Sequence, residues 1–333
     1  MSGFQKHRNG SKQTVKLSKQ EGLEDLTTRS SAGLSFSGHE TFTLRHGWLK
    51  KAVEAVQKNP HIFARDSAMV ELGVGKNMVR SIRHWALATE VVREVAGTRG
   101  AELCVSEFGA SLFGSQGYDP FLEDLNTLWL IQWKLAAKER RSTGWHWIFN
   151  YVRSNEFTRQ SLFELFVTEL EKRGTSGLSE SSLRRDIDCA IRTYVGTRKA
   201  GELLEESLEC PLVELELVRS DSEGILLRFN RGPKQSLADL IFLYALLEFW
   251  DARGASDSLA FSDVAFGEGS PGSVFKLDEN SIASSLERLA DVTDGCLIYD
   301  ETAGLRQVYR RKKIGKHSVL KQHYEGVALA AGE

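Results

Sequence analysis

Apolar side chains recur at helical spacing in the first part of the chain that is rich in them. From Thr43 they fall three or four positions apart up to Asn59, which predicts a helix of about four turns. Asp66 is placed to cap a short second helix that ends at Leu72. A third helix follows a turn that contains two glycines. Its predicted inner stripe consists of Met78, Val79, Ile82, Trp85 and Ala86.

Two segments of alternating polarity follow these helices. Residues 90–95 and 101–105 flank the turn Gly97-Thr98-Arg99-Gly100, which predicts a β-hairpin. Three helices followed by a glycine-tipped hairpin are the element order of a winged helix-turn-helix. We therefore predict such a unit over residues 35–117.

Residues 118–200 have a helical pattern throughout. Two runs rich in tryptophan, 125–137 and 145–152, are expected in the core, because an indole buries a large apolar area. Their tryptophans, Trp129, Trp133, Trp145 and Trp147, are thus interpreted as packing residues rather than base-stacking platforms. An amphipathic helix over residues 159–172 and a helix from Ser179 to Tyr194 then predict a second helix-turn-helix-like unit.

The pattern over residues 201–313 predicts a third, winged-helix-like domain. Strands are expected at residues 213–218 and 225–229, followed by an apolar helix over 237–250 with Ser236 as its cap. A helix at residues 281–290 and strands at 296–299 and 305–309 complete the domain, and residues 314–333 are expected as a tail. The predicted fold class is mainly α with β-hairpin wings, an α+β protein built from tandem winged helix-turn-helix-like units.

Composition adds an uneven charge distribution to this picture. Residues 1–34 are rich in Ser, Lys, Gln and Gly, which predicts a disordered basic arm. The net charge is only -2, yet residues 201–301 carry seven Lys and Arg against twenty-one Asp and Glu, and both ends are basic. This layout indicates local basic contacts together with an acidic surface that repels DNA or receives a basic partner.

Several classes of protein are disfavoured by the same inspection. No apolar run is long enough for a membrane span, and no apolar signal core is present at the N-terminus, so we expect a protein without membrane contact. The cysteines have no metal-ligand spacing, which favours reduced thiols and a cytoplasmic location. They are Cys104, Cys189, Cys210 and Cys296.

The segment LGVGKNMVRSIRHW, residues 72–85, has two interpretations. A phosphate-binding P-loop requires a glycine five positions before Gly75, a hydroxyl residue after Lys76 and a preceding strand. The chain has Val70 and Asn77 at those two positions and a helical pattern before them. We therefore interpret the segment as the turn and third helix of a helix-turn-helix.

This interpretation predicts a DNA-binding surface. Basic and amide side chains at the start of a recognition helix contact phosphates or base edges, although a solvated helix face is the plain alternative. The candidates on or beside the outer face of the third helix are Lys76, Asn77, Arg80, Arg83 and His84. Further candidates are Arg45 before the first helix, Arg99 in the hairpin, and Arg184 and Arg185 in the second unit.

Two pairs of residues are candidates for catalysis or metal binding. Asp186 and Asp188 would have to bind a metal together, but residues two apart on a helix point about 200° away from each other. A solvated, salt-bridged face is the favoured interpretation. His39 and Glu40, just before the first helix, suit proton transfer or metal binding, and equally suit helix capping. No Ser/His/Asp, HExxH or carboxylate-rich nuclease motif accompanies them.

Four blocks of the chain carry a family resemblance. They are FSGHETFTLRHGWLKKA (36–52), ELGVGKNMVRSIRHWA (71–86), LEDLNTLWLIQW (122–133) and RFNRGPKQSLADLIFLYALLEFW (228–250). Together they resemble a bacterial family of formerly unknown function whose members occur with DNA phosphorothioation genes. The resemblance covers roughly residues 35–310.

The resemblance implies a role in sulfur modification of DNA, an anti-phage system. Its partners would be DNA and the sulfur-transfer proteins, namely a cysteine desulfurase, an ATP-using sulfur transferase and an ATPase. The chain would present a DNA strand or nick it. For a nickase, the candidates are His39 and Glu40, or Asp186 and Asp188 with Mg²⁺ or Mn²⁺.

Two other functions remain open from the sequence. One is a winged-helix transcription regulator without enzymatic activity, which would prefer one operator sequence. The other is an adaptor that docks a basic partner on the acidic residues 201–301.

Overall fold

The computed structural model describes residues 33–326 except 140, 176, 197, 200, 201, 204–209, 255 and 303. Most of the predicted basic arm, residues 1–32, lies outside the described residues. Leu34, which the prediction placed in the arm, is only 1% exposed and belongs to the core. Among the described residues, no helix is both long and apolar enough to cross a membrane.

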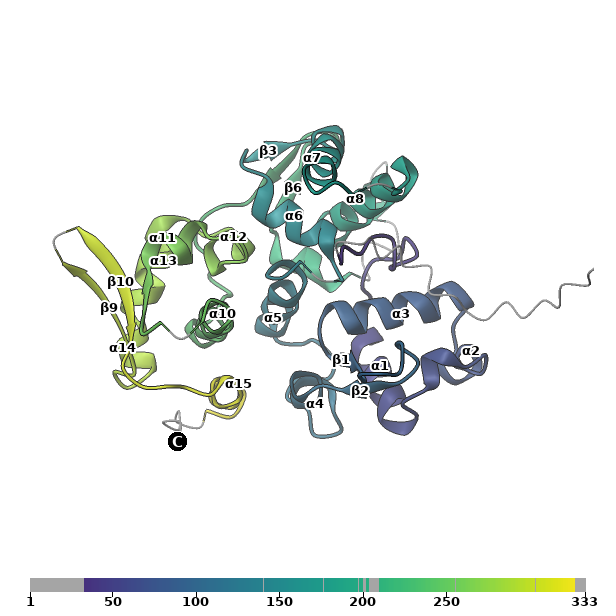
Figure 1. Ribbon diagram of the computed structural model, residues 1–333, viewed down its shortest axis with the longest axis horizontal. Coiled ribbons are helices and arrows are strands. Elements are labelled where there is room, and N and C mark those ends of the chain that lie inside the picture. The colour runs from purple at the N-terminus through teal and green to yellow at the C-terminus, as the bar shows by residue number, and fades with distance from the viewer. Residues whose placement is uncertain are drawn as a thin grey trace, which may run out of the picture.

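The N-terminal unit contains three helices followed by an antiparallel hairpin, in the predicted order (Figure 1). The first helix begins later than Thr43, because Gly47 adopts the left-handed conformation with φ 75°. Asp66 does not cap α2 as predicted. Ser67 occupies the N-cap position, and its side chain makes no capping hydrogen bond. The elements are α1 (Trp48–Lys58), η1 (Ile62–Ala64), α2 (Ala68–Leu72), α3 (Lys76–Ala88), β1 (Val92–Glu94), β2 (Leu103–Val105) and α4 (Glu107–Phe113).

The middle of the chain surrounds a central helix, α5, which packs against α6, α10, α12 and η2. The four tryptophans of α5 and α6 are at most 1% exposed, so the prediction that they are core residues is confirmed. The elements are α5 (Leu125–Ala136), α6 (Thr143–Tyr151), β3 (Glu156–Phe157), α7 (Arg159–Lys172), α8 (Glu180–Tyr194), β4 (Arg198–Lys199), β5 (Glu202–Leu203) and η2 (Pro211–Leu215).

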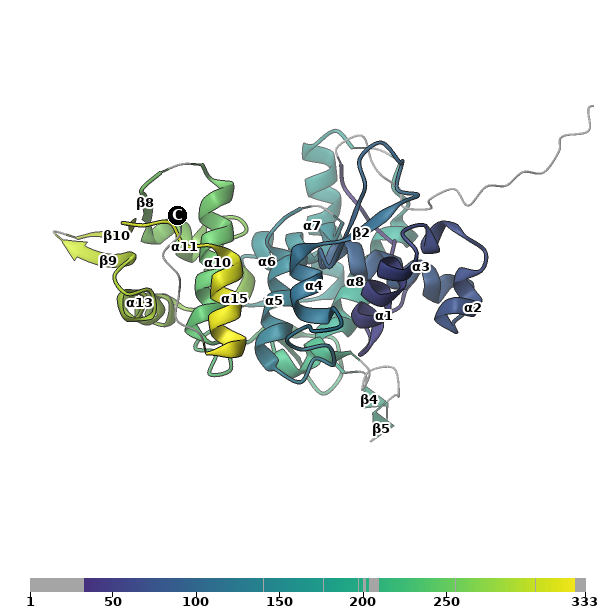
Figure 2. The ribbon, with the colours of Figure 1, turned by 90° about the horizontal axis from the view of Figure 1, so that it is seen from below.

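The C-terminal part has two small sheets and several short helices. Strands pair in the order β3-β7-β6 in one sheet and β8-β10-β9 in the other. Helix α15 lies alongside α10 (Figure 2). The elements are β6 (Val218–Ser220), β7 (Leu227–Phe229), α10 (Asp239–Ala252), β8 (Ser258–Ala260), α11 (Phe261–Phe266), α12 (Pro271–Phe275), α13 (Glu279–Glu287), α14 (Leu289–Val292), β9 (Leu297–Thr302), β10 (Leu305–Arg310) and α15 (Lys316–Glu325).

Three details of the sequence prediction for this part are wrong. The expected strand at 213–218 is mostly η2, because Pro211 starts a 3-10 turn that Glu216 ends at φ 47°. Ser236 does not cap α10; its hydroxyl accepts a hydrogen bond from Trp129 Nε1 at 3.1 Å, and Ala238 is the N-cap. The pattern also missed β3, β8 and α15, the last of which lies in the segment expected as a tail.

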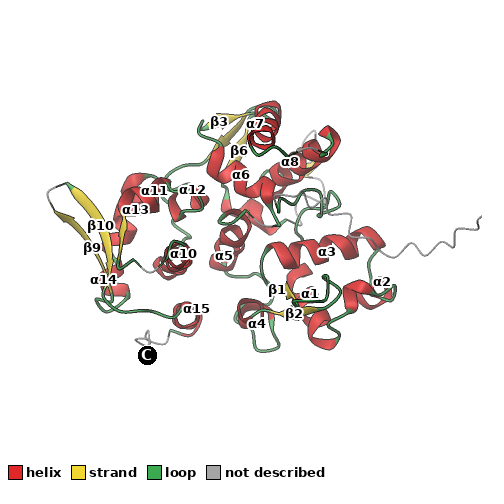
Figure 3. Cartoon of the chain, in the orientation of Figure 1, coloured by secondary structure: helices red, strands yellow, loops and turns green. Residues whose placement is uncertain are grey.

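The fold class is α+β. Helices dominate, and all sheets are small and antiparallel (Figure 3). One continuous cluster of buried apolar side chains runs from the N-terminal unit through α5 and α6 to α15. The assignment of the units as winged helices stays a prediction.

Candidate nucleic-acid interface

The segment before α1, residues 36–43, is called the His39 loop here. It lies between α3 and α8 and is the purple segment in that region of Figure 1. His39 is fully buried, and its Nε2 lies 3.0 Å from Oδ1 of Asp186, which is also buried. The fold thus joins two residues that the sequence analysis treated as alternative candidates.

Backbone hydrogen bonds define the tautomer of His39. The Thr41 N–H donates to Nδ1 at 3.0 Å, so the proton is on Nε2, facing Asp186. Burial lowers the pKa of His39, whereas Cys189 and Asp186 raise it, with a net rise. The Thr41 N–H opposes this rise, because a protonated ring would point a second N–H at it. We therefore assign a neutral His39 ring.

The His39 loop is strained and tightly held. Ser37, Glu40 and Thr41 have φ values of 62°, 49° and 68°, and each such conformation costs on the order of 1–3 kcal/mol for residues other than glycine. Arg192 Nη2 donates to Thr41 O at 2.6 Å from α8, and Trp85 Nε1 of α3 donates to a loop carbonyl at 3.1 Å. Strain that surrounding contacts maintain is typical of functional sites.

A cavity of about 360 Å³ lies on the α3 side of the loop, and we call it the basic cleft. Its walls come from η1 and α2, α3, the β1–β2 turn and the His39 loop. Six basic side chains and two carboxylates, those of Glu40 and Asp66, line the cleft. This excess of positive charge favours the binding of anions. The basic side chains are those of Arg65, Lys76, Arg80, Arg83, Arg99 and Arg141.

Most of the predicted recognition-helix residues lie at this cleft. Lys76 and Arg80 line it, and Asn77 is exposed in the same first turn of α3. The Arg80 guanidinium is 3.4 Å from Glu40 Oε1, so this arginine also contacts the loop. Arg99 of the β1–β2 turn is exposed at the rim.

His84, which was predicted on or beside the outer face of α3, lines the cleft but is buried. Its ring is only 7% exposed, because the His39 loop covers that side of α3 and the His39 ring packs edge-on at 5.7 Å. Burial lowers the pKa of His84 well below its ordinary value, and the nearby charges of Arg83 and Arg141 add to this effect. His84 is therefore a neutral residue in the floor of the cleft.

Arg83 connects α3 to the hairpin, and Arg141 connects the segment between α5 and α6 to it. Arg83 Nη2 donates to Glu94 Oε1 and to Gly100 O, both at 3.1 Å. Arg141 Nη2 is 2.5 Å from the other Glu94 oxygen. Sequence reasoning missed Arg141, although it lies in the basic run Lys138-Glu-Arg-Arg after α5. Both arginines thus position the hairpin as well as adding positive charge.

A second cavity of about 310 Å³ lies on the other side of the loop and is called the α8 cleft. Thr41, Arg159, Arg185, Asp188 and Arg192 line it. Arg159 Nε is 3.0 Å from Asp188 Oδ1, so the predicted solvated, salt-bridged face is found at Asp188, whereas for the buried Asp186 that prediction is wrong.

Two other predicted arginines lie apart from both cavities. Arg184 of α8 is exposed, pairs with Glu180 at 2.7 Å and lies 4.0 Å from the Phe163 ring centroid. Arg45 is half-buried, and its guanidinium lies 5.7 Å from the Phe42 ring centroid. Both are stabilised by aromatic faces.

The two acidic candidates of α8, Asp186 and Asp188, lie in different environments. Asp186 is buried and Asp188 is exposed, as expected for residues two apart on a helix. Asp186 Oδ1 accepts from His39 and from the Ser37 N–H, while Oδ2 is packed against Gly144. Within the described residues, no three His, Cys, Asp or Glu side chains are grouped to bind a metal. We assign no reaction step to a metal.

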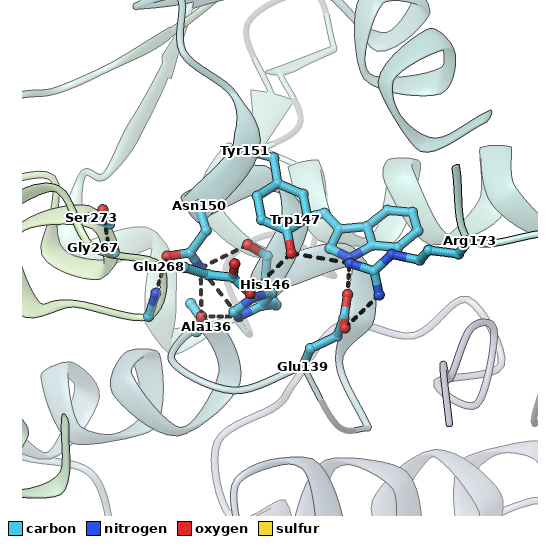
Figure 4. A network of polar contacts seen from close by, with 11 residues as sticks. Ala136, Glu139, His146, Trp147, Asn150, Tyr151, Arg173, Gly267, Glu268 and Ser273 are labelled. Carbon is cyan, nitrogen blue, oxygen red and sulfur yellow. Dashed lines mark hydrogen bonds and ion pairs between the residues drawn. The ribbon is translucent and has the colours of Figure 1, made fainter. Parts of the chain in front are cut away.

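Further histidine–carboxylate pairs occur elsewhere in the structure, and one of them, at α6, was indicated by no sequence motif. His146 Nε2 of α6 lies 3.1 Å from Oε1 of Glu268, in the turn between α11 and α12 (Figure 4). Tyr151 donates to the same oxygen at 3.0 Å, and Arg173 Nη2 donates to Tyr151 at 3.1 Å. Arg173 Nη1 also lies 2.7 Å from Glu139. We call these five residues the His146 network.

Comparisons with known proteins add a family and a fold. Residues 36–324 match the family described as "Protein of unknown function (DUF4007)". A crystal structure of SspB with bound magnesium ion is similar, with TM-score 0.78 and 32% identity over 87% of this chain and 88% of that one. A second SspB crystal structure gives TM-score 0.77 and 31% identity over the same shares. No curated protein matches the sequence.

Proposed function

Because this chain belongs to the DUF4007 family and shares its fold with SspB, we propose that it is a DNA-binding component of a DNA phosphorothioation system. SspB is the DNA-nicking component of the Ssp phosphorothioation system, and the sequence blocks quoted above carry the same resemblance. The proposed partners are DNA and the sulfur-transfer proteins of such a system. The predicted cytoplasmic location is part of this proposal.

The basic cleft is the observation that carries the DNA-binding role. Its cations lie at the start of α3, in the position of a recognition helix, and at the turn of a hairpin that would act as a wing. Lys76 and Asn77 are exposed there, while Arg80 reaches the cleft wall. Arginine and lysine neutralise backbone phosphates, and arginine and asparagine also form hydrogen bonds with base edges.

The His39 loop supports a second element of the proposal, strand nicking. Glu40 faces the basic cleft and is paired with Arg80, so its carboxylate would lie near a bound phosphate and serve as a general base. His39 does not reach the cleft, because its ring is fully buried against Asp186. We therefore propose Glu40 as the catalytic candidate and His39 as a positioning residue for the loop.

Equilibrium binding to labelled duplex DNA tests the DNA-binding proposal. Arg80→Ala and Lys76→Ala should each weaken binding and reduce the slope of log K against log salt by about 0.9 for each phosphate that is no longer neutralised. Arg173→Ala, in the His146 network, is the matched control and should leave both quantities unchanged. Unaltered affinity in both cleft variants would refute the proposal.

Two further measurements separate the alternatives. A transcription regulator should bind one sequence far more tightly than unrelated ones, whereas the proposed component should bind them with similar affinity at a given salt concentration. Supercoiled plasmid incubated with the protein and Mg²⁺ or Mn²⁺ should yield relaxed circles, and Glu40→Gln should abolish them. If no circles form with the wild type, the nicking element is wrong while the binding element stands.

A further inference from the structure

The acidic C-terminal block contains one local concentration of positive charge. Of its seven basic residues, Arg231, Lys234 and Lys276 occur where three segments meet at the end of β7. Phe229 N donates to Asn155 O at 3.0 Å, and Gly232 N donates to Lys276 O at 3.1 Å. The same contacts bring in Arg153, which follows α6. These four cations are called the β7 cluster.

The β7 cluster is organised around one aromatic ring. The Lys276 ammonium lies 4.0 Å from the centroid of Phe229, and the Arg231 guanidinium lies 5.8 Å from the same centroid. Lys276 is only 1% exposed and donates to Phe149 O at 2.5 Å. Arg153 and Arg231 are exposed, and Lys234 is half-buried. The cluster thus has a buried cation beneath three accessible ones.

Carboxylates offset the charge of this cluster only in part. Within the part of the chain that the structure describes, none of its four cations forms an ion pair. The two acids that interact electrostatically with Lys234 have closer partners of their own: Glu216 pairs with Arg219 at 2.7 Å, and Asp278 accepts from the Ser281 N–H at 2.8 Å. Lys234 donates instead to the carbonyl of Asn230.

The positive charges in the cluster repel one another, which disfavours the protonated forms of the two lysines. Burial lowers the pKa of Lys234 to about 8; the charges of Arg219 and Arg231 contribute to this shift, and those of Asp278 and Glu216 oppose it in part. Burial likewise lowers the pKa of Lys276 well below its ordinary value, with Arg231 and Arg153 adding to the effect. A bound anion would relieve this repulsion, because it replaces like-charge neighbours with an opposite charge.

We propose that Arg153, Arg231 and Lys234 form a binding site for a phosphate group, with Lys276 beneath it. Guanidinium groups match phosphate oxygens in pairs, and lysine adds a point charge. The phosphate belongs either to a DNA strand or to a free nucleotide, since the recognised chemistry is the same. The inference goes beyond the proposed function, because the β7 cluster shares no residue with the basic cleft.

Two probes test this site on the full chain. Calorimetric titration with pyrophosphate measures anion binding, and fluorescence anisotropy with a labelled duplex measures DNA binding. The double variant Arg153→Ala/Arg231→Ala should weaken at least one of them by about tenfold, and Lys234→Ala by less. Arg288→Ala is the matched control, because Arg288 is an exposed arginine of the same acidic block and is paired with Asp239 at 2.7 Å.

The pattern of weakened binding identifies the source of the phosphate. Reduced DNA affinity with a reduced salt slope assigns it to DNA. Reduced pyrophosphate binding with unchanged DNA affinity assigns it to a free nucleotide. Arg153→Lys/Arg231→Lys keeps the charge but loses the paired donors, so it should weaken binding less than the alanine double variant, which separates loss of charge from misfolding. Unchanged binding of both probes in the alanine double variant overturns the site, whereas failure of the proposed function would appear only in Lys76→Ala and Arg80→Ala.

Discussion

Two histidine–carboxylate pairs with nearly equal separations lie in different surroundings. His39 and Asp186 are 3.0 Å apart, with side chains 0% and 2% exposed, beneath a strained loop. His146 and Glu268 are 3.1 Å apart, but the Glu268 side chain is 58% exposed. The first pair lies between two clefts lined by cations, and the second belongs to a network with its own acids.

The contrast shows that the distance between a histidine and a carboxylate does not by itself indicate a site. In the His146 network, two glutamates and one arginine share their hydrogen bonds, so no unbalanced positive charge remains at its surface. At the His39 loop, the pair is hidden and maintains a backbone that presents Glu40 to the basic cleft. We infer that the first pair supports binding and the second supports packing.

Asp186→Ala should have the largest effect on the free energy of unfolding. Comparing it with Glu268→Ala shows whether the buried pair stabilises the fold more than the exposed pair does. It leaves the His39 Nε2–H and the Ser37 N–H without an acceptor in a buried place, which should lower the free energy of unfolding by about 3 kcal/mol. Glu268→Ala removes a largely exposed acceptor and should cost less than about 1 kcal/mol. Urea unfolding measures both values, and equal destabilisation would contradict the comparison.

The outcome for the sequence predictions follows from what each pattern reports. Helical periodicity correctly predicted α3 and the exposure of Lys76 and Asn77, because a period of 3.6 residues determines which positions share a face of one helix. It could not show that a distant loop covers His84, since periodicity contains no information about a second layer. The pairing of His39 with Asp186 joins residues 147 positions apart, which no local motif reveals.

Glu40→Gln should change DNA affinity rather than stability. It removes the one carboxylate that the His39 loop contributes to the basic cleft, and should therefore tighten DNA binding about threefold at low salt, with a smaller gain at high salt. Glu268→Gln removes a comparable charge from the His146 network and should leave DNA affinity unchanged. Anisotropy titrations at two salt concentrations measure the difference; an equal gain in both variants would make the effect one of net charge alone.

Thr41→Gly should have the smallest effect and tests the strain at the loop. Glycine adopts the left-handed conformation freely, whereas the β-branched threonine does not, so the variant should gain about 0.5 kcal/mol in unfolding free energy relative to Thr41→Ala. The Thr41→Ala control removes the hydroxyl but keeps the strained backbone. Thermal and urea unfolding of the pair provide the measurement, and a less stable glycine variant would show that the loop is not strained.

Amide hydrogen exchange with and without duplex DNA tests the central claim most directly. If the basic cleft binds DNA, amides of the His39 loop and of the first turn of α3 should exchange more slowly in the complex, while those at residues 146–151 should not change. Protection at residues 146–151 with none at the His39 loop and α3 would contradict the assignment of the basic cleft as the DNA interface.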